Sequence, residues 1–561
     1  MKNEIFKSVK TQMIKGKWVI FSLVFILFFI TGSVLSQVTQ QWEARYNGPG
    51  NDYDKANSIT IDNSGNVYVT GCSNGSGTDK DYCTIKYNSS GVQQWVARYN
   101  GPGNSEDEAR SIVIDILGNV YVTGYSKGSG TYYDYCTIKY NSAGVQQWVA
   151  RYNGPLNSND EAYSIAIDGS GNVYVTGWSP ESGTTTDDYC TIKYNSSGIQ
   201  QWVARYNGPG NSSDYARSIA IDGSGNVYVT GYSYGSGTGW DYCTIKYNSS
   251  GVEQWTARYN GQANDWDYAY FIALDNSGNV YVTGKSYGGS GTYYDYCTIK
   301  YNSSGIQQWV ARYNGPGNDE DWAHHIAVDG LGNVYVTGES FGSGTYKDYC
   351  TIKYNSSGVQ QWVARYNGPG NSFDYAYSIA LDGSGNVYVT GSSPGSENHD
   401  DYCTIKYNST GVQQWVARYN GPGNNWDEAY SIAVDGSGNV YVTGKSEGSG
   451  TSDDYCTIKY SQGVGIKKIS TEIPSSFSLS QNYPNPFNPI TKIKFDLPKN
   501  AFTKLTIYNM LGREVETIVN EQLNAESYEV TFDGAKYTSG VYYYRLNASE
   551  FVETKKMILV K

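Results

Sequence analysis

Apolar and polar residues alternate with a period of two along most of the chain. In residues 164–208 the alternation falls into four short segments rich in β-branched and aromatic residues, separated by Gly, Asn and Ser. Such segments are typical of β-strands, and short connections such as GSGN and NSSG suit antiparallel hairpins. The pattern predicts four strands, called A to D here: Ser164–Gly169, Asn172–Gly177, Asp188–Asn195 and Gln200–Gly208.

This block of four strands recurs along the chain. One tryptophan per copy opens the sequence W-x-A-R-Y-N-G, every 53 or 54 residues: Trp42, Trp95, Trp148, Trp202, Trp255, Trp309, Trp362 and Trp415. Four strands in a unit of about 50 residues are typical of a β-propeller blade. A solenoid would need polar end copies, whereas the end copies here are as apolar as the middle ones.

The order of the strands predicts how a ring closes. The chain enters at a lone D strand, Gln40–Asn47, passes seven times through A to D, and ends on A, B and C at Tyr460. We therefore expect the first strand to complete the last blade beside Asp454–Tyr460, because closure removes exposed strand edges. The prediction is an eight-bladed β-propeller over residues 37–463.

The copies resemble a known repeat. Asp427–Gly444 reads DEAYSIAVDGSGNVYVTG, nearly letter for letter the pattern D-x-A-x-x-I-A-V-D-x-x-G-N-V-Y-V-T-G of the bacterial SBBP-type β-propeller repeat. The resemblance covers roughly residues 40–460. It implies a propeller with strand A innermost, and it implies little about activity.

After Gly463 the repeat ends. We expect a linker over residues 464–476 and a small Ig-like β-sandwich over residues 477–561, because TKIKFDL, KLTIYNM, YEVTFDG, VYYYRLN and KKMILVK alternate like strands. An ordinary Ig-like module would explain these strands. It would not explain the phrase NYPNPFNP: Asn482, Tyr483, Pro484, Asn485, Pro486, Phe487, Asn488 and Pro489.

That phrase, followed by Leu511–Val515, Ser539–Tyr542 and the basic pair Lys555 and Lys556, resembles the C-terminal sorting domain of the type IX secretion system (Por secretion, type A). The resemblance implies that the domain directs a periplasmic protein to an outer-membrane translocon, with the secretion machinery as partner. In this family the domain is often removed on release.

Residues 1–36 read as a signal peptide. A lysine-bearing start precedes the apolar run Trp18–Ile30 and a small-residue segment ending at Ser36. An uncleaved anchor is the alternative, although the run is shorter than the roughly 20 residues of a membrane span. No cysteine follows the run, which argues against a lipoprotein. We expect a secreted or outer-surface protein that passes through the periplasm and keeps no stable membrane span.

The net negative charge of the chain disfavours some classes of binding partner. Five lysines and one glutamate lie in the leader, so the formal charge of −12 becomes about −16 for the mature chain. Such a field disfavours nucleic acid and anionic membrane surfaces as partners.

The chain has nine cysteines, eight of them at one position per blade: Cys83, Cys136, Cys190, Cys243, Cys297, Cys350, Cys403 and Cys456. Packed sheets lie about 10 Å apart, beyond the roughly 7 Å between Cα atoms that a disulfide tolerates. We therefore expect buried thiols that fill space between blades. Cys72 is across a hairpin from Cys83, and a disulfide between these two stays open.

Two aspartates recur in every copy, one in the loop before strand A and one before Tyr-Cys, and both sets are expected on one face of the ring. The sets are Asp54, Asp107, Asp160, Asp214, Asp267, Asp321, Asp374 and Asp427, and Asp81, Asp134, Asp188, Asp241, Asp295, Asp348, Asp401 and Asp454. Clustered carboxylates suit calcium. The favoured interpretation is that each aspartate caps the amides of its own turn, because every blade has one. No cofactor is expected.

The copies differ mainly in the B–C loops and after NGPGN, and so on that same face. Aromatic residues interleave there with acids such as Glu106 and Glu320, and the candidate ligand-binding residues are Tyr53, Tyr132, Tyr133, Trp240, Trp266, Tyr293, Tyr294, Trp322, Phe373 and Trp426. Exposed aromatics at loop tips are typical of surfaces that bind proteins or glycans. Drift after duplication, with the rings packed locally, is the alternative.

Catalytic chemistry is hard to find. The three histidines, His324, His325 and His399, come with no nucleophile motif or zinc-ligand spacing. The spacing from Gly91 to Trp95 resembles the tryptophan-docking motif of eight-bladed quinoprotein dehydrogenases, but their adjacent-cysteine pair and acidic site are absent. Packing explains the motif, since a buried tryptophan contributes about 2–3 kcal/mol.

The favoured prediction is therefore a secreted or cell-surface binding protein that is not an enzyme. Two alternatives stay open: a secreted propeller enzyme, quinoprotein-like or glycan-active, and a purely structural protein of the surface layer.

Overall fold

The structure is a computed structural model that describes residues 38–181, 186–289, 293–396, 399–462, 467–470, 473–534 and 537–561. The expected signal peptide, residues 1–36, lies outside the described residues. Every regular element in these ranges is a β-strand. The prediction of an all-β propeller followed by a small sandwich is confirmed at the level of fold class.

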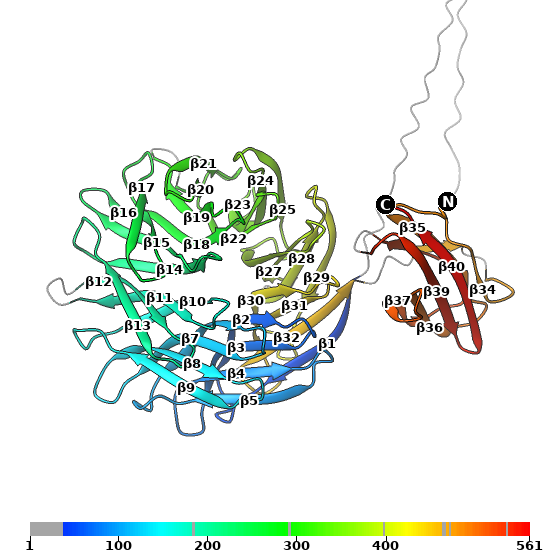
Figure 1. The fold of residues 1–561 in the computed structure, drawn as a ribbon, viewed down its shortest axis with the longest axis horizontal. Helices are drawn as coiled ribbons and strands as arrows, with labels where there is room; N and C mark the ends of the chain where they lie inside the picture. Colours follow the sequence, from blue (N-terminus) through cyan, green and yellow to red (C-terminus); the bar gives the residue numbers. More distant parts are fainter. Residues whose placement is uncertain are drawn as a thin grey trace, which may run out of the picture. The chain divides into compact units, whose positions relative to one another are not determined.

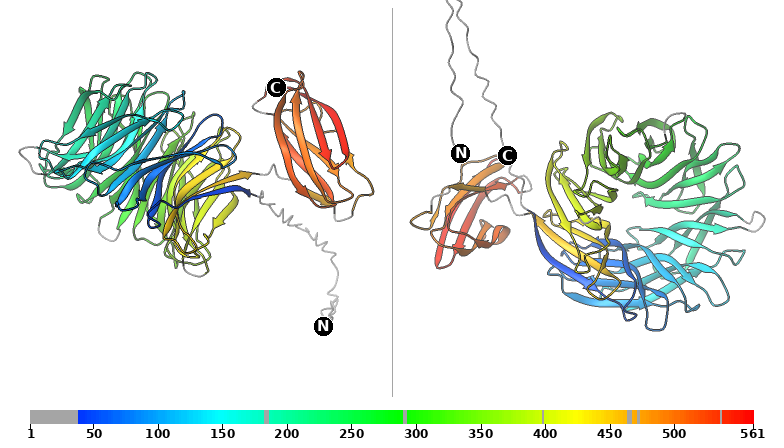
Figure 2. Two further views of the ribbon diagram at one scale, coloured as in Figure 1. Left: turned by 90° about the horizontal axis from the view of Figure 1, so that it is seen from below. Right: turned by 180° about the vertical axis from the view of Figure 1, so that it is seen from behind.

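Residues 38–462 form eight four-stranded antiparallel sheets arranged around a common centre (Figures 1 and 2). The first three contain β2 (Asp54–Ile61), β3 (Val67–Asn74), β4 (Lys80–Tyr87) and β5 (Gln93–Tyr99); β6 (Asp107–Ile114), β7 (Val120–Lys127), β8 (Tyr133–Tyr140) and β9 (Gln146–Tyr152); and β10 (Glu161–Ile167), β11 (Val173–Pro180), β12 (Asp187–Tyr194) and β13 (Gln200–Tyr206). The next two contain β14 (Asp214–Ile221), β15 (Val227–Gly235), β16 (Gly239–Tyr247) and β17 (Glu253–Tyr259); and β18 (Asp267–Leu274), β19 (Val280–Tyr287), β20 (Tyr294–Tyr301) and β21 (Gln307–Tyr313). The sixth and seventh contain β22 (Asp321–Val328), β23 (Val334–Phe341), β24 (Lys347–Tyr354) and β25 (Gln360–Tyr366); and β26 (Tyr375–Leu381), β27 (Val387–Pro394), β28 (Asp400–Tyr407) and β29 (Gln413–Tyr419).

The eighth sheet joins the two ends of this region. It contains β30 (Asp427–Val434), β31 (Val440–Glu447), β32 (Asp453–Gln462) and, outermost, β1 (Val38–Tyr46). Strand β1 pairs antiparallel with β32 from Val38 opposite Gln462 to Tyr46 opposite Tyr455. Arg45 on β1 forms an ion pair with Asp454 at 3.1 Å, as Arg98 does with Asp81 at 2.9 Å inside the first sheet.

The first strand of each sheet lies nearest the centre (Figure 1), and these inner strands contact one another from sheet to sheet, including β2 with β30. Each begins earlier than the apolar pattern predicts: β10 starts at Glu161 rather than Ser164. A β-bulge between Ala162 and Ser164 shifts the register there, so period two breaks and hides the start of the strand. Aspartates such as Asp54 therefore begin strand A, which corrects their expected place in a loop.

A circle of hydrogen bonds joins the sheets. The buried tyrosine before each repeated cysteine donates its hydroxyl proton to the backbone carbonyl oxygen of the next sheet's cysteine, at 2.9–3.0 Å. The last of these bonds runs from Tyr455 to Cys83, from the eighth sheet to the first. All nine cysteines are buried free thiols, which confirms the prediction for the eight repeated ones.

No disulfide joins Cys72 to Cys83. In the register of β3 and β4, Cys72 lies opposite Tyr82, and Cys83 lies opposite Gly71. Neighbouring residues of a strand point to opposite faces, so the two sulfur atoms lie on different sides of the sheet. The sequence shows that Cys72 and Cys83 lie on paired strands of one hairpin, but it does not show that their pairing is offset by one residue.

The repeated tryptophans are half-buried, except for Trp415, which is 2% exposed. Each of the other seven donates its indole N–H to a serine carbonyl in the C–D turn of the next sheet, such as Trp95 to Ser142 at 3.2 Å. The ring packs on a turn glycine with φ near +80°, where a Cβ would come within 2.6 Å of it. These tryptophans therefore fasten neighbouring sheets together.

Trp415 differs because the sheet that it faces is the eighth, where no C–D turn connects β32 to β1. Its buried Nε1 has no acceptor among the described residues. Nearby, the Gln462 side chain donates to the Tyr388 hydroxyl at 2.7 Å and to the Gly438 carbonyl at 2.9 Å, and it contacts Lys406. Gln462 therefore occupies the place that a serine of the C–D turn takes between the other sheets.

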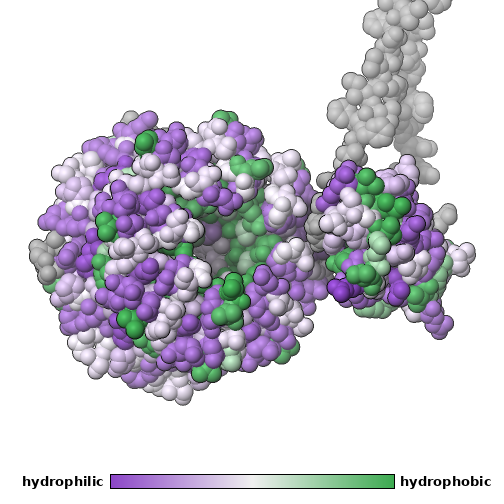
Figure 3. All heavy atoms as spheres, viewed as in Figure 1, coloured by the Kyte–Doolittle hydropathy of each residue, from purple (hydrophilic) through white to green (hydrophobic). Residues whose placement is uncertain are grey.

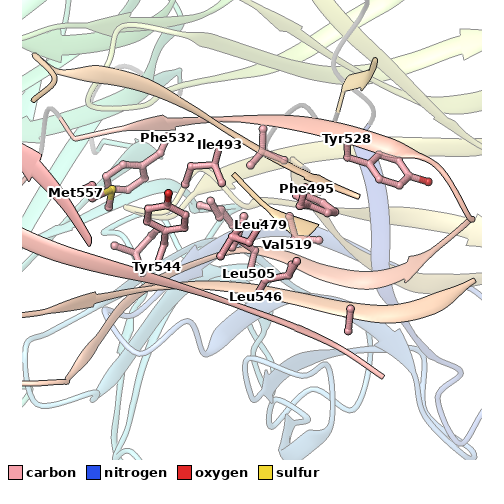
Figure 4. Close-up of a cluster of buried hydrophobic side chains, with 14 of the residues drawn as sticks. Leu479, Ile493, Phe495, Leu505, Val519, Tyr528, Phe532, Tyr544, Leu546 and Met557 are labelled. Carbon is pink, nitrogen blue, oxygen red and sulfur yellow. The ribbon is translucent and has the colours of Figure 1, made fainter. Parts of the chain in front are cut away.

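The C-terminal region is a sandwich of two four-stranded sheets, in the orders β33-β38-β35-β34 and β37-β36-β39-β40. Its strands are β33 (Lys467–Ser470), β34 (Ser478–Leu479), β35 (Ile490–Asp496), β36 (Ala501–Asn509), β37 (Glu514–Leu523), β38 (Ser527–Asp533), β39 (Gly540–Ala548) and β40 (Phe551–Leu559). Residues 467–470 pair with β38, which corrects their assignment to the linker. Side chains such as Ile493, Leu505 and Tyr544 fill the core between the sheets (Figure 4).

The NYPNPFNP phrase is built into this sandwich at two points. Asn482 is buried and donates through Nδ2 to the Pro484 carbonyl and the Thr491 hydroxyl, both at 3.0 Å. Phe487 is also buried, against Phe532. Between them Tyr483 stays 81% exposed. The phrase therefore has a structural frame and one outward-facing ring.

Deleting Gln40–Asn47 should lower the melting temperature of the propeller by well over the few degrees that a single core substitution causes. The deletion removes most of β1, the Arg45 ion pair and the Trp42 contact with the first sheet, and leaves β32 as an open edge. Thermal unfolding followed by circular dichroism measures the change. Replacing Gln41 alone by Ala is the control, and an unchanged melting temperature after the deletion would rule out the closing role of β1.

Candidate binding surface

The structure brings variable positions of the repeat into one layer. Each sheet contributes the second residue of its A segment, the bulge residue of strand A, the residue after the glycine of strand B, and the residue before Asp-Tyr-Cys of strand C. In the fifth sheet these are Tyr268, Tyr270, Lys285 and Tyr294. We call the corresponding positions of all eight sheets the variable layer.

Sequence reasoning assigned variation to loops. It named residues at two of these four positions, such as Trp322 and Tyr294, and missed the bulge residue and the residue after the glycine of strand B, which lie inside strands. Between the constant Asp and Ala of strand A, the copies read Lys55, Glu108, Glu161, Tyr215, Tyr268, Trp322, Tyr375 and Glu428. Comparing the eight copies column by column would have found the variable positions of strands A and B, because the residues that flank them hardly change.

The bulge residues belong to the innermost strands, which surround the centre of the ring (Figure 1), and the space-filling view is hollowed at that centre (Figure 3). They are Asn57, Arg110, Tyr163, Arg217, Tyr270, His324, Tyr377 and Tyr430. Tyr163 lies between two guanidinium groups, with Arg110 at 4.2 Å and Arg217 at 4.4 Å from its ring centre. The bulge therefore turns one side chain per sheet towards its counterpart in a neighbouring sheet.

Aromatic rings concentrate on one side of the layer. Tyr215, Tyr232, Trp240, Trp266, Tyr268 and Tyr294 form a chain of ring contacts across the fourth and fifth sheets, which we call the aromatic arc; the ring centres lie 4.8–6.0 Å apart. Trp266 is 43% exposed. It packs over Gly239, where a Cβ would come within 2.5 Å of the indole. The arc therefore offers one accessible indole backed by fixed rings.

The structure distributes the ten candidate aromatics over several places. Trp240, Trp266 and Tyr294 belong to the arc, and Trp322 adjoins it through Lys285, whose Nζ lies 3.5 Å from the Trp322 ring centre and 4.3 Å from that of Tyr294. Tyr132, Tyr293, Trp266, Phe373 and Trp426 are exposed, and Tyr53, Tyr133, Trp240, Tyr294 and Trp322 are half-buried.

The remaining candidates lie in separate surroundings. Phe373 contacts Tyr346, with ring centres 4.9 Å apart, and Trp426 lies near His399. Tyr53 packs beneath the Lys80 ammonium, and Tyr132 and Tyr133 lie beside Lys127. The ten residues therefore do not form one continuous patch.

Charged side chains dominate the other side of the layer. Lys80 pairs with Glu106 at 2.9 Å, Arg110 with Glu161 at 3.0 Å, and Lys445 with both Glu428 and Asp453. The layer is thus polarised, with an aromatic side over the fourth and fifth sheets and a charged side over the eighth, first and second.

The repeated aspartates hold the turns of this face. Asp54 accepts hydrogen bonds from the backbone N–H groups of Gly48 and Asn74, and Asp81 accepts one from Arg98. Burial raises the pKa of Asp54 to about 6. Within the described ranges, no group of three or more His, Cys, Asp or Glu side chains is placed to hold a metal ion. The contacts of Asp54 agree with the predicted capping of backbone amides, whereas Asp81 accepts from the side chains of Thr78 and Arg98 instead.

Asp188 breaks this pattern. It is buried, and neither carboxylate oxygen has a hydrogen-bond partner among the residues that the structure describes. Its arginine, Arg205, instead donates to the backbone carbonyls of Ser179 and Pro180 and lies 3.8 Å from Glu181. Burial and the nearby negative charge of Asp214 raise the pKa of Asp188 to about 7.

Family models match both regions. A model described as a β-propeller repeat (SBBP) matches residues 41–77, 94–130, 147–181, 201–237, 308–343, 361–396 and 414–450. A model described as a secretion system C-terminal sorting domain matches residues 481–561. The chain thus carries SBBP propeller repeats and ends in a type IX sorting domain, as the sequence motifs predicted.

Solved structures with some likeness include PorZ, a surface component of the type IX secretion system of Porphyromonas gingivalis. PorZ is 14% identical over 90% of this chain and 81% of that chain, with a TM-score of 0.30. The β-propeller domain of the Trilobed protease from Pyrococcus furiosus is 9% identical over 66% of this chain and 97% of that chain, with a TM-score of 0.36. Neither score supports an inference about function. Among curated proteins, none matches the chain.

The sorting domain determines the destination. It implies export by the type IX machinery to the cell surface or the medium. The described residues contain no helix long and apolar enough to cross a membrane.

Replacing Asp188 by Asn should stabilise the protein at pH 8 and leave it unchanged near pH 4. The folded-state pKa of about 7 lies above the ordinary value of 3.8, so the ionised carboxylate costs stability increasingly as the pH rises from 4 to 7. We expect a gain of about 1–3 kcal/mol at pH 8, measured by thermal or urea unfolding.

Asp134→Asn is the matched control. Asp134 occupies the equivalent position in the second sheet but pairs with Arg151 at 2.8 Å, so its replacement should destabilise the protein at pH 8. Equal effects of the two substitutions would contradict the assignment of Asp188 as an unpaired buried carboxyl.

Proposed function

We propose that this secreted surface propeller is a binding protein whose aromatic arc takes a glycan. The observation that carries the proposal is Trp266, an accessible indole held in place by Trp240 and by the absence of a side chain at Gly239. The apolar face of a sugar ring packs on such a ring at little cost in conformational entropy, because the indole is already fixed.

Polar groups around the arc fit the hydroxyls of a sugar. The Tyr215 hydroxyl donates to Asp187 at 2.8 Å, and the half-buried Tyr294 brings a second phenol group to the arc. Sites for small ligands combine an apolar floor with a few directed polar groups, and the arc supplies both.

The distribution of the aromatics favours a glycan over a protein partner. A protein interface of standard size has a desolvated apolar core with a polar rim. The exposed rings Tyr132, Phe373 and Trp426 instead lie in three separate places outside the arc, near Lys127, Tyr346 and His399 respectively. We also propose that the protein acts by binding rather than by catalysis, with no cofactor.

Replacing Trp266 by Ala should weaken glycan binding at least about tenfold, a loss of about 1.4 kcal/mol. A glycan array identifies the probe, and titration calorimetry with the purified mature protein then measures affinity. Tyr132→Ala is the control, because Tyr132 is as exposed but lies near Lys127 on the charged side. Equal losses in both variants, or binding that survives without Trp266, would exclude the arc as the site.

Truncation after Gly463 should leave a folded propeller in the periplasm. The change removes the sorting domain and keeps all eight sheets. Cell fractionation with an antibody to the propeller measures the distribution, and the full chain is the control. Normal appearance of the truncated protein at the cell surface would contradict the role of residues 481–561 in export.

A further inference from the structure

Lys285 carries a buried ammonium group that forms no ion pair or hydrogen bond within the described residues. It is 7% exposed and lies on β19, opposite Tyr268. Three aromatic rings surround its Nζ, with centres at 3.5 Å for Trp322, 4.3 Å for Tyr294 and 5.0 Å for Tyr268. No hydrogen-bond acceptor or carboxylate pairs with it among the described residues.

The nearby acids are already engaged. Glu339 contacts His324 Nε2 at 2.5 Å and Lys347 at 3.7 Å, and Glu320 contacts Lys347 at 3.4 Å. Of Lys285, His324 and Lys347, only Lys285 therefore has no ion pair among the described residues. Because ring faces only partly replace water, burial lowers the pKa of Lys285 to about 8.

A second donor without a partner lies beside it. The Nε1 atom of Trp322 is buried and has no acceptor in the part of the chain that the structure describes. The Trp322 ring lies between two ammonium groups, since Lys347 Nζ is 3.9 Å from its centre. Two neighbouring donors without acceptors indicate that the missing group is an acceptor, and the positive charge favours an anionic one.

We infer that Lys285 and Trp322 receive the carboxylate of an acidic sugar whose neighbouring ring packs on the aromatic arc. The inference rests on the proposed glycan-binding function and names the class of glycan. The arc continues from Lys285 through Tyr268 and Trp240 to the accessible Trp266, so one short oligosaccharide spans both parts.

The ligand carries an isolated acidic residue and is not a polyanion. The charged side of the layer presents Glu106, Glu428 and Asp453, and the whole chain has a net charge of −12. This field opposes a polymer of acids, whereas a single carboxylate gains from Lys285 at short range.

The test compares two disaccharides that differ in one group, one ending in glucuronic acid and the other in glucose at the same linkage. Calorimetry with the purified mature protein should show at least tenfold tighter binding of the acidic form. Lys285→Met should remove this preference, and Lys285→Arg should keep it. Lys300→Met is the control, because Lys300 lies on β20 of the same sheet and donates to the Ser356 carbonyl instead.

Lys285→Met should also raise the melting temperature, because it removes an unpaired buried charge and keeps the apolar stem. Equal affinity for the two disaccharides, or a preference that survives in Lys285→Met, would overturn the inference. If Trp266→Ala still abolishes binding of the neutral form, the proposed glycan function stands alone. If a glutamate-containing peptide binds more tightly than either disaccharide, a protein partner replaces the acidic sugar.

Discussion

The propeller depends on the hydrogen bond from a buried tyrosine hydroxyl to the cysteine carbonyl of the next sheet. Eight such bonds, from Tyr82 to Cys136 around to Tyr455 to Cys83, form an unbroken circle. A buried phenol without a partner is costly, so each bond fixes the spacing of two neighbouring sheets. The free thiols, the half-buried tryptophans and the bulged inner strands all fit into the spacing that these bonds set.

Because the residues that hold neighbouring sheets together are the same in every copy, the residues of the variable layer can differ from copy to copy. The frame uses Tyr, Cys, Thr and Arg at fixed positions in every copy, and the variable layer changes from Lys55 and Lys80 in the first sheet to Tyr268 and Tyr294 in the fifth. A ring of identical frames therefore presents eight different sets of side chains. The polarity of the layer, aromatic on one side and charged on the other, follows from substitutions that leave the frame untouched.

Period-two alternation and the 53- or 54-residue repeat were enough to predict the strands, the propeller and the sandwich. They could not predict the start of strand A, because the bulge at residues such as Tyr163 breaks the alternation. They also could not separate Cys72 from Cys83, since a one-residue register offset decides which face a side chain takes.

The candidate site was only partly predictable for a related reason. Loop residues such as Trp266 are recognisable because they are large, apolar and surrounded by turn residues. Lys285 looks like an ordinary strand residue. Its lack of an ion pair among the described residues goes with the packing of three rings of the fifth and sixth sheets around it. Contacts between sheets leave no local trace in the sequence.

The pairing of β1 with β32 has a consequence for the order of folding. Arg45 and its partner Asp454 are 409 residues apart in the chain, so the first strand to be synthesised has to wait for the last. Seven sheets complete themselves from neighbouring segments, and only the eighth requires both ends of the propeller region, β1 and β32. The ring therefore closes in a single late step, when β1 pairs with β32. Until then, a partly synthesised propeller keeps an unpaired strand edge.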